Sequence, residues 1–321
     1  MDGTGTQECI AVIGAGLMGH GIAQVFAQGG CLVKMQDLTP AALDNAQARI
    51  RSNLTALSEK GLVEGGRIDE IMSRITSTVR LADAVDGADF VIESAPENLR
   101  IKIELFEAME SFSAPATVLA SNTSMLKISD IGKGVKKKER LIVTHWFNPP
   151  YLIPVVEVVQ GADTALDTVE RTVSLLERMG KVPVRVLKEV PGHLLNRIQF
   201  ALFRETLGLL QEGVATAEEI DKGVSASLGL RLAAIGPLRS IDLAGIDLFW
   251  FGMKDIYSCL DNAPEPQQII QEKVKAGDLG KKSGRGFFEY PPGSPSNAVE
   301  RERDDKIIEI LKILYPKKRE G

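Results

Sequence analysis

The chain has 321 residues, of which 44% are hydrophobic and 25% are charged, and its formal net charge is −5 at neutral pH. This balance is that of an ordinary globular protein, with enough length for two domains. The negative charge argues against a general affinity for nucleic acid or for an acidic membrane surface. A membrane-spanning helix needs about 18 apolar residues in a row, and no apolar run in the sequence approaches that length.

The first predicted elements are a strand, a tight turn and a helix. Apolar residues at 8–13 predict the strand, and those at about 17–27 predict the helix. The turn between them has the pattern G-x-G-x-x-G, formed by Gly14, Gly16 and Gly19. In a dinucleotide site the first glycine makes the turn, the second lets the backbone approach a pyrophosphate, and the third packs the helix on its strand. The helix N-terminus then attracts the phosphates.

A second apolar strand is predicted at 31–37, and it ends at Asp37. An acidic residue about 20 positions after the glycine turn typically bonds the ribose hydroxyls of the cofactor. Because a carboxylate would repel a 2′-phosphate, Asp37 favours NAD over NADP.

Further along the chain, strands alternate with helical patterns such as those at 41–59 and 99–112. Alternation of this kind predicts an α/β fold with a Rossmann-type, doubly wound and mainly parallel sheet. The remaining strands are expected at 88–93, 117–120, 140–145, 154–159 and 181–187.

The pattern changes after residue 190, where strands stop and long helical segments begin. One helix is expected to start at Thr216, which has capping-box spacing with Glu219. The last helix carries an apolar stripe that needs a surface to cover, formed by Ile307, Ile308, Leu311 and Leu314. We therefore expect three parts: an NAD-binding domain at 1–190, a helical substrate and dimerisation domain at 191–290, and a linker with a charged C-terminal helix at 291–321.

The three cysteines are Cys9, Cys31 and Cys259, and they are widely spaced. They are expected to be reduced core residues, which favours a reducing compartment. The chain starts without the basic and apolar segments of a secretory signal. These features predict a cytoplasmic protein.

Only three histidines can titrate near neutral pH, and His145 is the best placed of them. It ends a predicted strand, at the sheet edge where open α/β folds bind their ligands. Glu157 lies on the next predicted strand, and a returning chain could bring its carboxylate to the imidazole. A structural histidine remains the alternative. The segment 121–124, Ser-Asn-Thr-Ser, also follows a strand and is either part of the site or a helix cap.

Several motifs in this order resemble those of the L-3-hydroxyacyl-CoA dehydrogenases and of relatives that act on other 3-hydroxy acids. The likeness covers nearly the whole chain. The motifs are GAGLMGHGIA at 14–23, ESAPENLRIKIELF at 93–106, SNTSML at 121–126, HWFNPP at 145–150, PGHLLNR at 191–197, GPLRSIDLAGID at 236–247 and GKKSGRGFFEY at 280–290.

The resemblance implies roles for individual residues. His145 matches the catalytic base, Glu157 its carboxylate partner, and Ser124 and Asn196 the polar groups around the reacting oxygen. It implies NAD as the cofactor and a homodimer formed through the helical domain, and no metal is needed. The cofactor-binding positions that it implies are Gly14, Gly16, Leu17, Met18, Gly19, Asp37, Glu97, Lys102, Asn122 and Asn148.

The resemblance implies reversible oxidation of the 3-hydroxyl of a short-chain L-3-hydroxyacyl-CoA, a reaction of fatty acid metabolism. This thioester substrate is favoured because it is the commonest in the family and because Lys102 and the serine-asparagine loop are retained. A free 3-hydroxy acid such as L-gulonate, carnitine or 3-hydroxybutyrate is the alternative, because NPPYLIPVVEVV looks closer to the branch with λ-crystallin and the gulonate and carnitine dehydrogenases. A noncatalytic, crystallin-like role is a third reading. His193 stands where the family usually has phenylalanine, either as a hydrogen-bond donor behind the site or as a tolerated polar residue.

Overall fold

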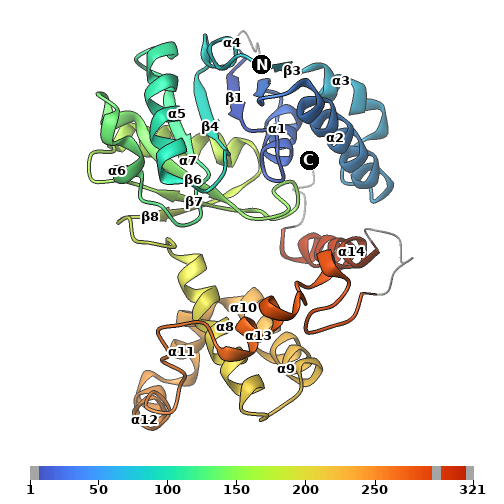
Figure 1. The fold of residues 1–321 in the computed structure, drawn as a ribbon, viewed down its shortest axis with the longest axis vertical. Coiled ribbons are helices and arrows are strands. Elements are labelled where there is room, and N and C mark those ends of the chain that lie inside the picture. Colours follow the sequence, from blue (N-terminus) through green and yellow to red (C-terminus); the bar gives the residue numbers. More distant parts are fainter. Residues whose placement is uncertain (1–6, 291–297, 316–321) are drawn as a thin grey trace. The chain divides into compact units, whose positions relative to one another are not determined.

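The computed structural model describes residues 7–290 and 298–315. The chain forms two compact units, residues 1–196 and 197–321 (Figure 1). The expected linker at 291–297 lies outside the described residues.

The first unit is built on one eight-stranded sheet with the strand order β3-β2-β1-β4-β5-β6-β7-β8. Neighbouring strands are parallel except β6 and β7, which are antiparallel. The predicted fold class is confirmed. The strands are β1 Cys9–Ile13, β2 Leu32–Gln36, β3 Ile75–Thr78, β4 Phe90–Glu93, β5 Val118–Ser121, β6 Leu141–Trp146, β7 Val155–Val159 and β8 Val182–Val186.

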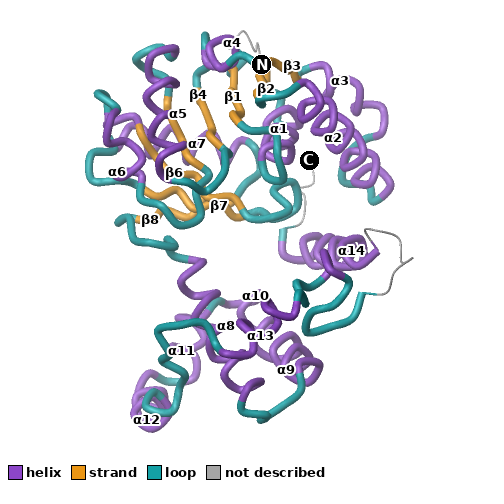
Figure 2. The backbone as a smooth tube through the Cα atoms, viewed as in Figure 1, coloured by secondary structure: helices purple, strands orange, loops and turns teal. Residues whose placement is uncertain are grey.

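Helices cover both faces of this sheet, as Figure 2 shows for the orange strands. Alternate residues of β1 point to opposite faces, so that Ile10 and Val12 join a core with α1, α2 and α7, whereas Ala11 and Ile13 join a core with α4, α5 and α6. The helices of the first unit are α1 Gly19–Gln28, α2 Pro40–Glu59, α3 Ile68–Ser73, α4 Leu81–Val85, α5 Leu99–Phe112, α6 Ile128–Ile131 and α7 Leu166–Arg178.

Strand β3 was not expected from the sequence. Only Ile75 of its four residues is fully buried, so the strand lacks the apolar run or clear alternation that would mark it. The strand lies at the edge of the sheet, where one neighbour is missing and less burial is needed.

The cysteines are all free, but they do not share one environment. Cys31 is buried just before β2, and Cys9 is half-buried at the start of β1. Cys259 is exposed, so the expectation that all three are core residues is wrong for this one. It follows the apolar helix α12, and that local apolar character does not lead to burial.

After β8, the elements that the structure describes are all helices. They include the π-helical turn Ser225–Gly229 between α9 and α10. The expected helix start at Thr216 is confirmed, because its Oγ accepts a hydrogen bond from the Glu219 amide at 3.4 Å. The helices of the second unit are α8 Leu195–Gln211, α9 Ala217–Val224, α10 Leu230–Ile235, α11 Pro237–Ala244, α12 Ile246–Ile256, α13 Gln268–Ala276 and α14 Ala298–Leu314. None of the helices in the described part of the chain is long and apolar enough to cross a membrane.

Several helices of this unit carry exposed apolar side chains, α12 and α14 among them. On α14, Ile308 is buried while Leu314 is exposed. Helix α12 exposes four large side chains by 58–67% each: Ile246, Leu248, Trp250 and Phe251. Exposure on this scale on one short helix is typical of a surface that meets a partner.

Candidate active site

The glycine turn between β1 and α1 has the geometry of a phosphate-binding turn. Gly14 adopts a φ of +96°, and a Cβ there would lie 2.7 Å from the Ser94 carbonyl oxygen. A Cβ on Gly19 would lie 1.7 Å from the Gly14 carbonyl oxygen, so the third glycine permits close packing of helix and turn. At Gly16 a Cβ would meet nothing within 4 Å. The turn therefore leaves open space beside the backbone of Gly16, where a pyrophosphate can approach.

The first turn of α1 and the end of β2 complete this region. Met18, at the N-cap of α1, is half-buried and makes no side-chain cap, so the first amides of the helix stay available to an anion. Leu17 is 59% exposed. The Asp37 carboxylate accepts hydrogen bonds from the amides of Ala15 at 2.8 Å and Leu38 at 2.7 Å. These groups fit the pyrophosphate and the ribose of a dinucleotide.

His145 and Glu157 form a buried pair at the carboxyl end of β6. The antiparallel register of β6 and β7 makes them direct cross-strand partners. The Nδ1 of His145 lies 2.7 Å from Oε2 of Glu157, and the two side chains are 4% and 0% exposed. An ionised carboxylate only accepts hydrogen bonds, so Nδ1 carries the proton and Nε2 keeps a free lone pair. That is the state required of a general base.

The second oxygen of Glu157 accepts hydrogen bonds from the backbone amides of Leu194 at 3.0 Å and Leu195 at 2.8 Å. Burial by itself would raise the pKa of Glu157, but the hydrogen bonds from His145 and from the two amides outweigh it and hold the pKa below its usual range. The carboxylate is thus ionised at neutral pH. Sequence reasoning missed the two amides, because backbone groups leave no side-chain signature.

The loop after β5 is tied to Glu97 and Asn196. Oε1 of Glu97 accepts hydrogen bonds from the Thr123 hydroxyl at 2.5 Å and from the amides of Ser124 and Met125 at 3.0 Å. The Asn196 amide donates to the Ser124 carbonyl oxygen at 3.1 Å. The structure therefore brings Ser124, Glu97 and Asn196 together.

The two other asparagines of the expected site differ in their surroundings. Oδ1 of Asn122 accepts a hydrogen bond from the Trp146 amide at 2.9 Å, which joins the ends of β5 and β6. Asn148 is exposed in the segment after β6, next to a cis bond to Pro149. The first asparagine holds the sheet edge, while the second is free to meet a ligand.

Lys102 is enclosed rather than free. Its side chain is 1% exposed, and Nζ lies 2.6 Å from Oε1 of the fully buried Glu93 and 3.5 Å from Oε2 of Glu97. The other oxygen of Glu93 accepts from the Ser121 hydroxyl at 2.6 Å. Sequence reasoning missed Glu93, although a carboxylate at the carboxyl end of a strand was a signal for it. The lysine thus ties the end of β4 to the segment before α5.

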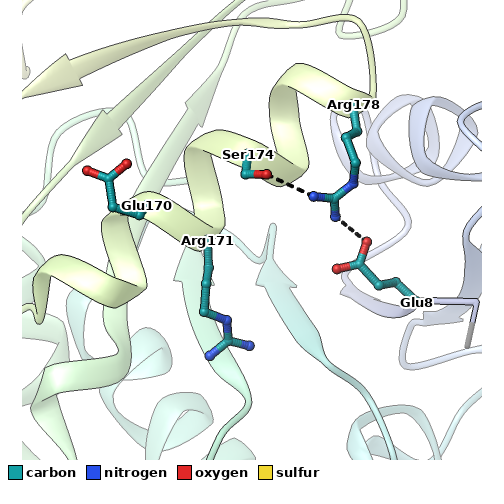
Figure 3. Close-up of a pocket in the computed structure, with 5 residues that line it drawn as sticks. All are labelled: Glu8, Glu170, Arg171, Ser174 and Arg178. Atoms are coloured by element: carbon teal, nitrogen blue, oxygen red, sulfur yellow. Dashed lines mark hydrogen bonds and ion pairs between the residues drawn. The ribbon is translucent and has the colours of Figure 1, made fainter. Parts of the chain in front are cut away.

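A surface cavity lies at the opposite edge of the sheet. Figure 3 shows Arg178 of α7 pointing toward Ser174 and toward Glu8, which precedes β1. Because this is the amino end of β1, the cavity is remote from the His145 pair, and its charges already have partners. It is lined by Glu8, Glu170, Arg171, Ser174 and Arg178.

Within residues 7–290 and 298–315, no group of three or more histidine, cysteine or carboxylate side chains is arranged to hold a metal ion.

The chain matches two family models over almost its whole length. Residues 9–190 match the model described as 3-hydroxyacyl-CoA dehydrogenase, NAD binding domain. Residues 192–290 match the model described as 3-hydroxyacyl-CoA dehydrogenase, C-terminal domain.

Similar proteins carry different names. The chain is 36% identical over 309 residues to the 5-formyl-3-hydroxy-2-methylpyridine 4-carboxylate 5-dehydrogenase of Mesorhizobium japonicum, covering 95% of this chain and 97% of the relative. It is 35% identical over 313 residues to the lambda-crystallin of Oryctolagus cuniculus, covering 95% of both. It is 37% identical over 282 residues to a probable 3-hydroxybutyryl-CoA dehydrogenase of Bacillus subtilis, covering 88% of this chain and 96% of the relative.

Among solved structures, the chain is similar to that of a 5-formyl-3-hydroxy-2-methylpyridine 4-carboxylic acid 5-dehydrogenase, described as an NAD⁺-dependent dismutase. The TM-score is 0.88 at 35% identity, with 96% of this chain and 99% of that chain covered.

Proposed function

The chain belongs to the 3-hydroxyacyl-CoA dehydrogenase family and is an NAD-dependent oxidoreductase, and from this premise we propose that it oxidises the hydroxyl group of a small free hydroxy acid, with His145 as the general base. The observation that carries this proposal is the buried contact of 2.7 Å between His145 and Glu157. It gives the imidazole the tautomer in which Nε2 can take a proton.

NAD, held by the glycine turn and Asp37, would supply the acceptor for the hydride of the carbinol carbon. His145 takes the hydroxyl proton at Nε2, and Glu157 holds the ring in place and stabilises the imidazolium that forms. In the reverse direction the imidazolium donates this proton.

Ser124 and Asn196 are proposed to orient the reacting oxygen by hydrogen bonds. The Asn196 amide has two N–H groups and uses one of them on the Ser124 carbonyl oxygen. We propose that the second N–H and the Ser124 hydroxyl donate to the substrate oxygen. Their part is to position that oxygen, while the proton itself goes to His145.

Two observations favour a free acid as the substrate. The sequence-based preference for a CoA thioester relied on the family's commonest activity, on Lys102 and on the serine-asparagine loop, and of these the Lys102 side chain is buried against Glu93. The relative with a TM-score of 0.88 is named for a free pyridine carboxylate, whereas a 3-hydroxybutyryl-CoA dehydrogenase from Ralstonia eutropha has a TM-score of 0.74. A CoA thioester is the second candidate, favoured by the identity of 37% to the Bacillus subtilis protein.

We also propose that residues 1–190 bind the cofactor, that residues 191–290 are a helical substrate and dimerisation domain, and that 291–321 is a linker with a charged helix. The exposed apolar side chains of α12 support the dimer. The three free cysteines support a location in the cytoplasm. A monomer at micromolar concentration, measured by light scattering, would refute the dimer.

The substrate class is tested by initial rates in both directions. NADH oxidation is measured with acetoacetate and with acetoacetyl-CoA at matched concentrations, and NAD reduction with gulonate, carnitine and 3-hydroxybutyrate. A free-acid enzyme turns over one of the acids and gains nothing from the CoA arm, whereas a CoA enzyme strongly prefers the thioester because that arm supplies binding energy.

The role of His145 is tested with the variant His145→Ala. We expect it to lose about 10²–10⁴-fold in turnover, because the general base is removed. NADH affinity, measured by fluorescence titration, should stay unchanged. Persistent turnover in this variant would show that His145 is not the base.

A further inference from the structure

His193 lies in the turn between β8 and α8, and its side chain is completely buried. Its φ is +53°, and it is the only non-glycine residue with a positive φ in the described parts of the chain. The left-handed region is sterically costly for a residue with a Cβ, and such a conformation persists only where the surrounding contacts hold it. These contacts show what the residue holds in place.

The hydrogen bonding of the ring fixes its protonation state. Nε2 lies 3.0 Å from the Thr123 carbonyl oxygen, and a carbonyl only accepts, so Nε2 carries the hydrogen. Nδ1 is buried with no hydrogen-bond partner among the described residues. Burial lowers the pKa of His193, and it outweighs the opposing effect of the bond to Thr123. The ring is therefore neutral, in the Nε2–H tautomer.

His193 lies beside His145 and directly before the two amides that bind Glu157. The centre of its ring lies 5.4 Å from that of the His145 ring. The two residues that follow it, Leu194 and Leu195, donate their amides to Glu157. The turn that His193 occupies thus decides where these two amides point.

We infer that His193 is a positioning residue of the active site, which pins its own turn to the Thr123 carbonyl and so aims the amides of Leu194 and Leu195 at Glu157. This inference rests on the proposed roles of His145 and Glu157. The proposed role also requires the His193 ring to be neutral. A charged imidazole so close to His145 would disfavour the imidazolium that forms on His145 during oxidation. The titratable groups that face His193 are His145 of β6, Glu157 of β7 and Glu97 of the segment before α5.

Two substitutions separate the hydrogen bond from the bulk of the ring. His193→Phe keeps an aromatic ring but leaves the buried Thr123 carbonyl without its donor. His193→Gln supplies an amide N–H in place of Nε2 and does not titrate. We expect the Phe variant to lose about tenfold in kcat with little change in the KM for NAD, because an unmet buried acceptor displaces the turn. The Gln variant should regain most of that loss and keep the wild-type pH profile of kcat between pH 6 and 9.

The inference is overturned if His193→Phe keeps its kcat within twofold, or if His193→Gln is as impaired as His193→Phe. A changed pH profile in the Gln variant would also overturn it, because His193 would then titrate in the working range.

A measurement of the protonation state of the ring in the wild-type protein does not depend on the activity of the variants. With only three histidines in the chain, ¹⁵N-resolved NMR can separate the imidazoles, and His193 is assigned by the signal lost in His193→Gln. We expect a neutral Nε2–H ring at pH 7 and above, and an Nδ1–H tautomer or a charged ring there would refute the inference. Because this signal is independent of turnover, a failure of the proposed function, such as an active His145→Ala, is distinguished from a failure of the role of His193.

Discussion

Replacement of Glu157 by glutamine tests the active-site geometry most directly. The glutamine oxygen can still accept the amides of Leu194 and Leu195, but its NH₂ group then faces Nδ1 of His145. Nδ1 must become an acceptor, so the proton moves to Nε2 and the imidazole can no longer act as a base. The side-chain volume is almost unchanged, so the tautomer is the main change.

The expected loss follows from this tautomer. An equivalent change of carboxylate to amide behind a catalytic histidine lowers kcat by about 10⁴ in serine proteases. We expect Glu157→Gln to lose about 10³–10⁴ in kcat, which is about 4–5.5 kcal/mol of transition-state stabilisation. The assay is the initial rate of NADH formation at saturating NAD, with NADH affinity measured by fluorescence as the control. A loss below tenfold with unchanged NADH affinity would refute the proposed proton route.

The same variant has a pH-dependent effect on stability. The pKa of Glu157 is lower in the folded protein than in the unfolded chain, so the unfolded chain binds more protons between the two values. This contribution to the free energy of unfolding is complete above the unfolded pKa and is lost as the pH falls through the folded pKa. In urea titrations, the difference between wild type and Glu157→Gln should be larger at pH 7 than at pH 3. An equal difference at both pH values would contradict this linkage.

The cofactor site and the thiols provide further predictions. Gly16→Ala should keep the wild-type melting temperature and weaken NADH binding at least tenfold, because its Cβ would enter open space that the cofactor needs. Gly19→Ala should lower the melting temperature, because its Cβ would lie 1.7 Å from the Gly14 carbonyl oxygen. Equal melting temperatures for the two variants would contradict this. Asp37→Ala should weaken NADH binding by about 1–3 kcal/mol and NADPH binding less, measured by fluorescence, because the ribose loses its carboxylate while repulsion of a 2′-phosphate is relieved. The exposed Cys259 should react quickly with a thiol reagent, and Cys31 only after unfolding, because burial raises the pKa of its thiol to about 11; a fast thiol that persists in Cys259→Ser would contradict this.

Local motifs predicted the first strand, turn and helix of the first unit well. The glycine turn, helix α1 and Asp37 lie close together in the chain, and their spacing follows from the geometry of one strand-turn-helix unit. The hydrogen bond from the Ala15 amide to Asp37 joins the ends of that unit. Short-range geometry of this kind is readable from sequence.

The contact between His145 and Glu157 needed information from the fold. Their spacing made a contact conceivable, but only the antiparallel register of β6 and β7 makes them cross-strand partners. The amides of Leu194 and Leu195 and the buried Glu93 were missed, because they serve the site through long-range contacts that no local pattern records.

The antiparallel pairing of β6 and β7 fixes the positions of His145 and Glu157, whereas the segment between the two strands is not paired. Side chains alternate between the faces of a strand, so a slip of one residue in this pairing would send His145 or Glu157 to the wrong face. The connecting segment 147–154 lies outside this pairing, and it places the Phe147 ring 4.5 Å from that of His145 and leaves Asn148 exposed. We expect substitutions at these two positions to change which hydroxy acid is preferred while the contact between His145 and Glu157 stays intact, which would let one chemistry diversify across several substrates.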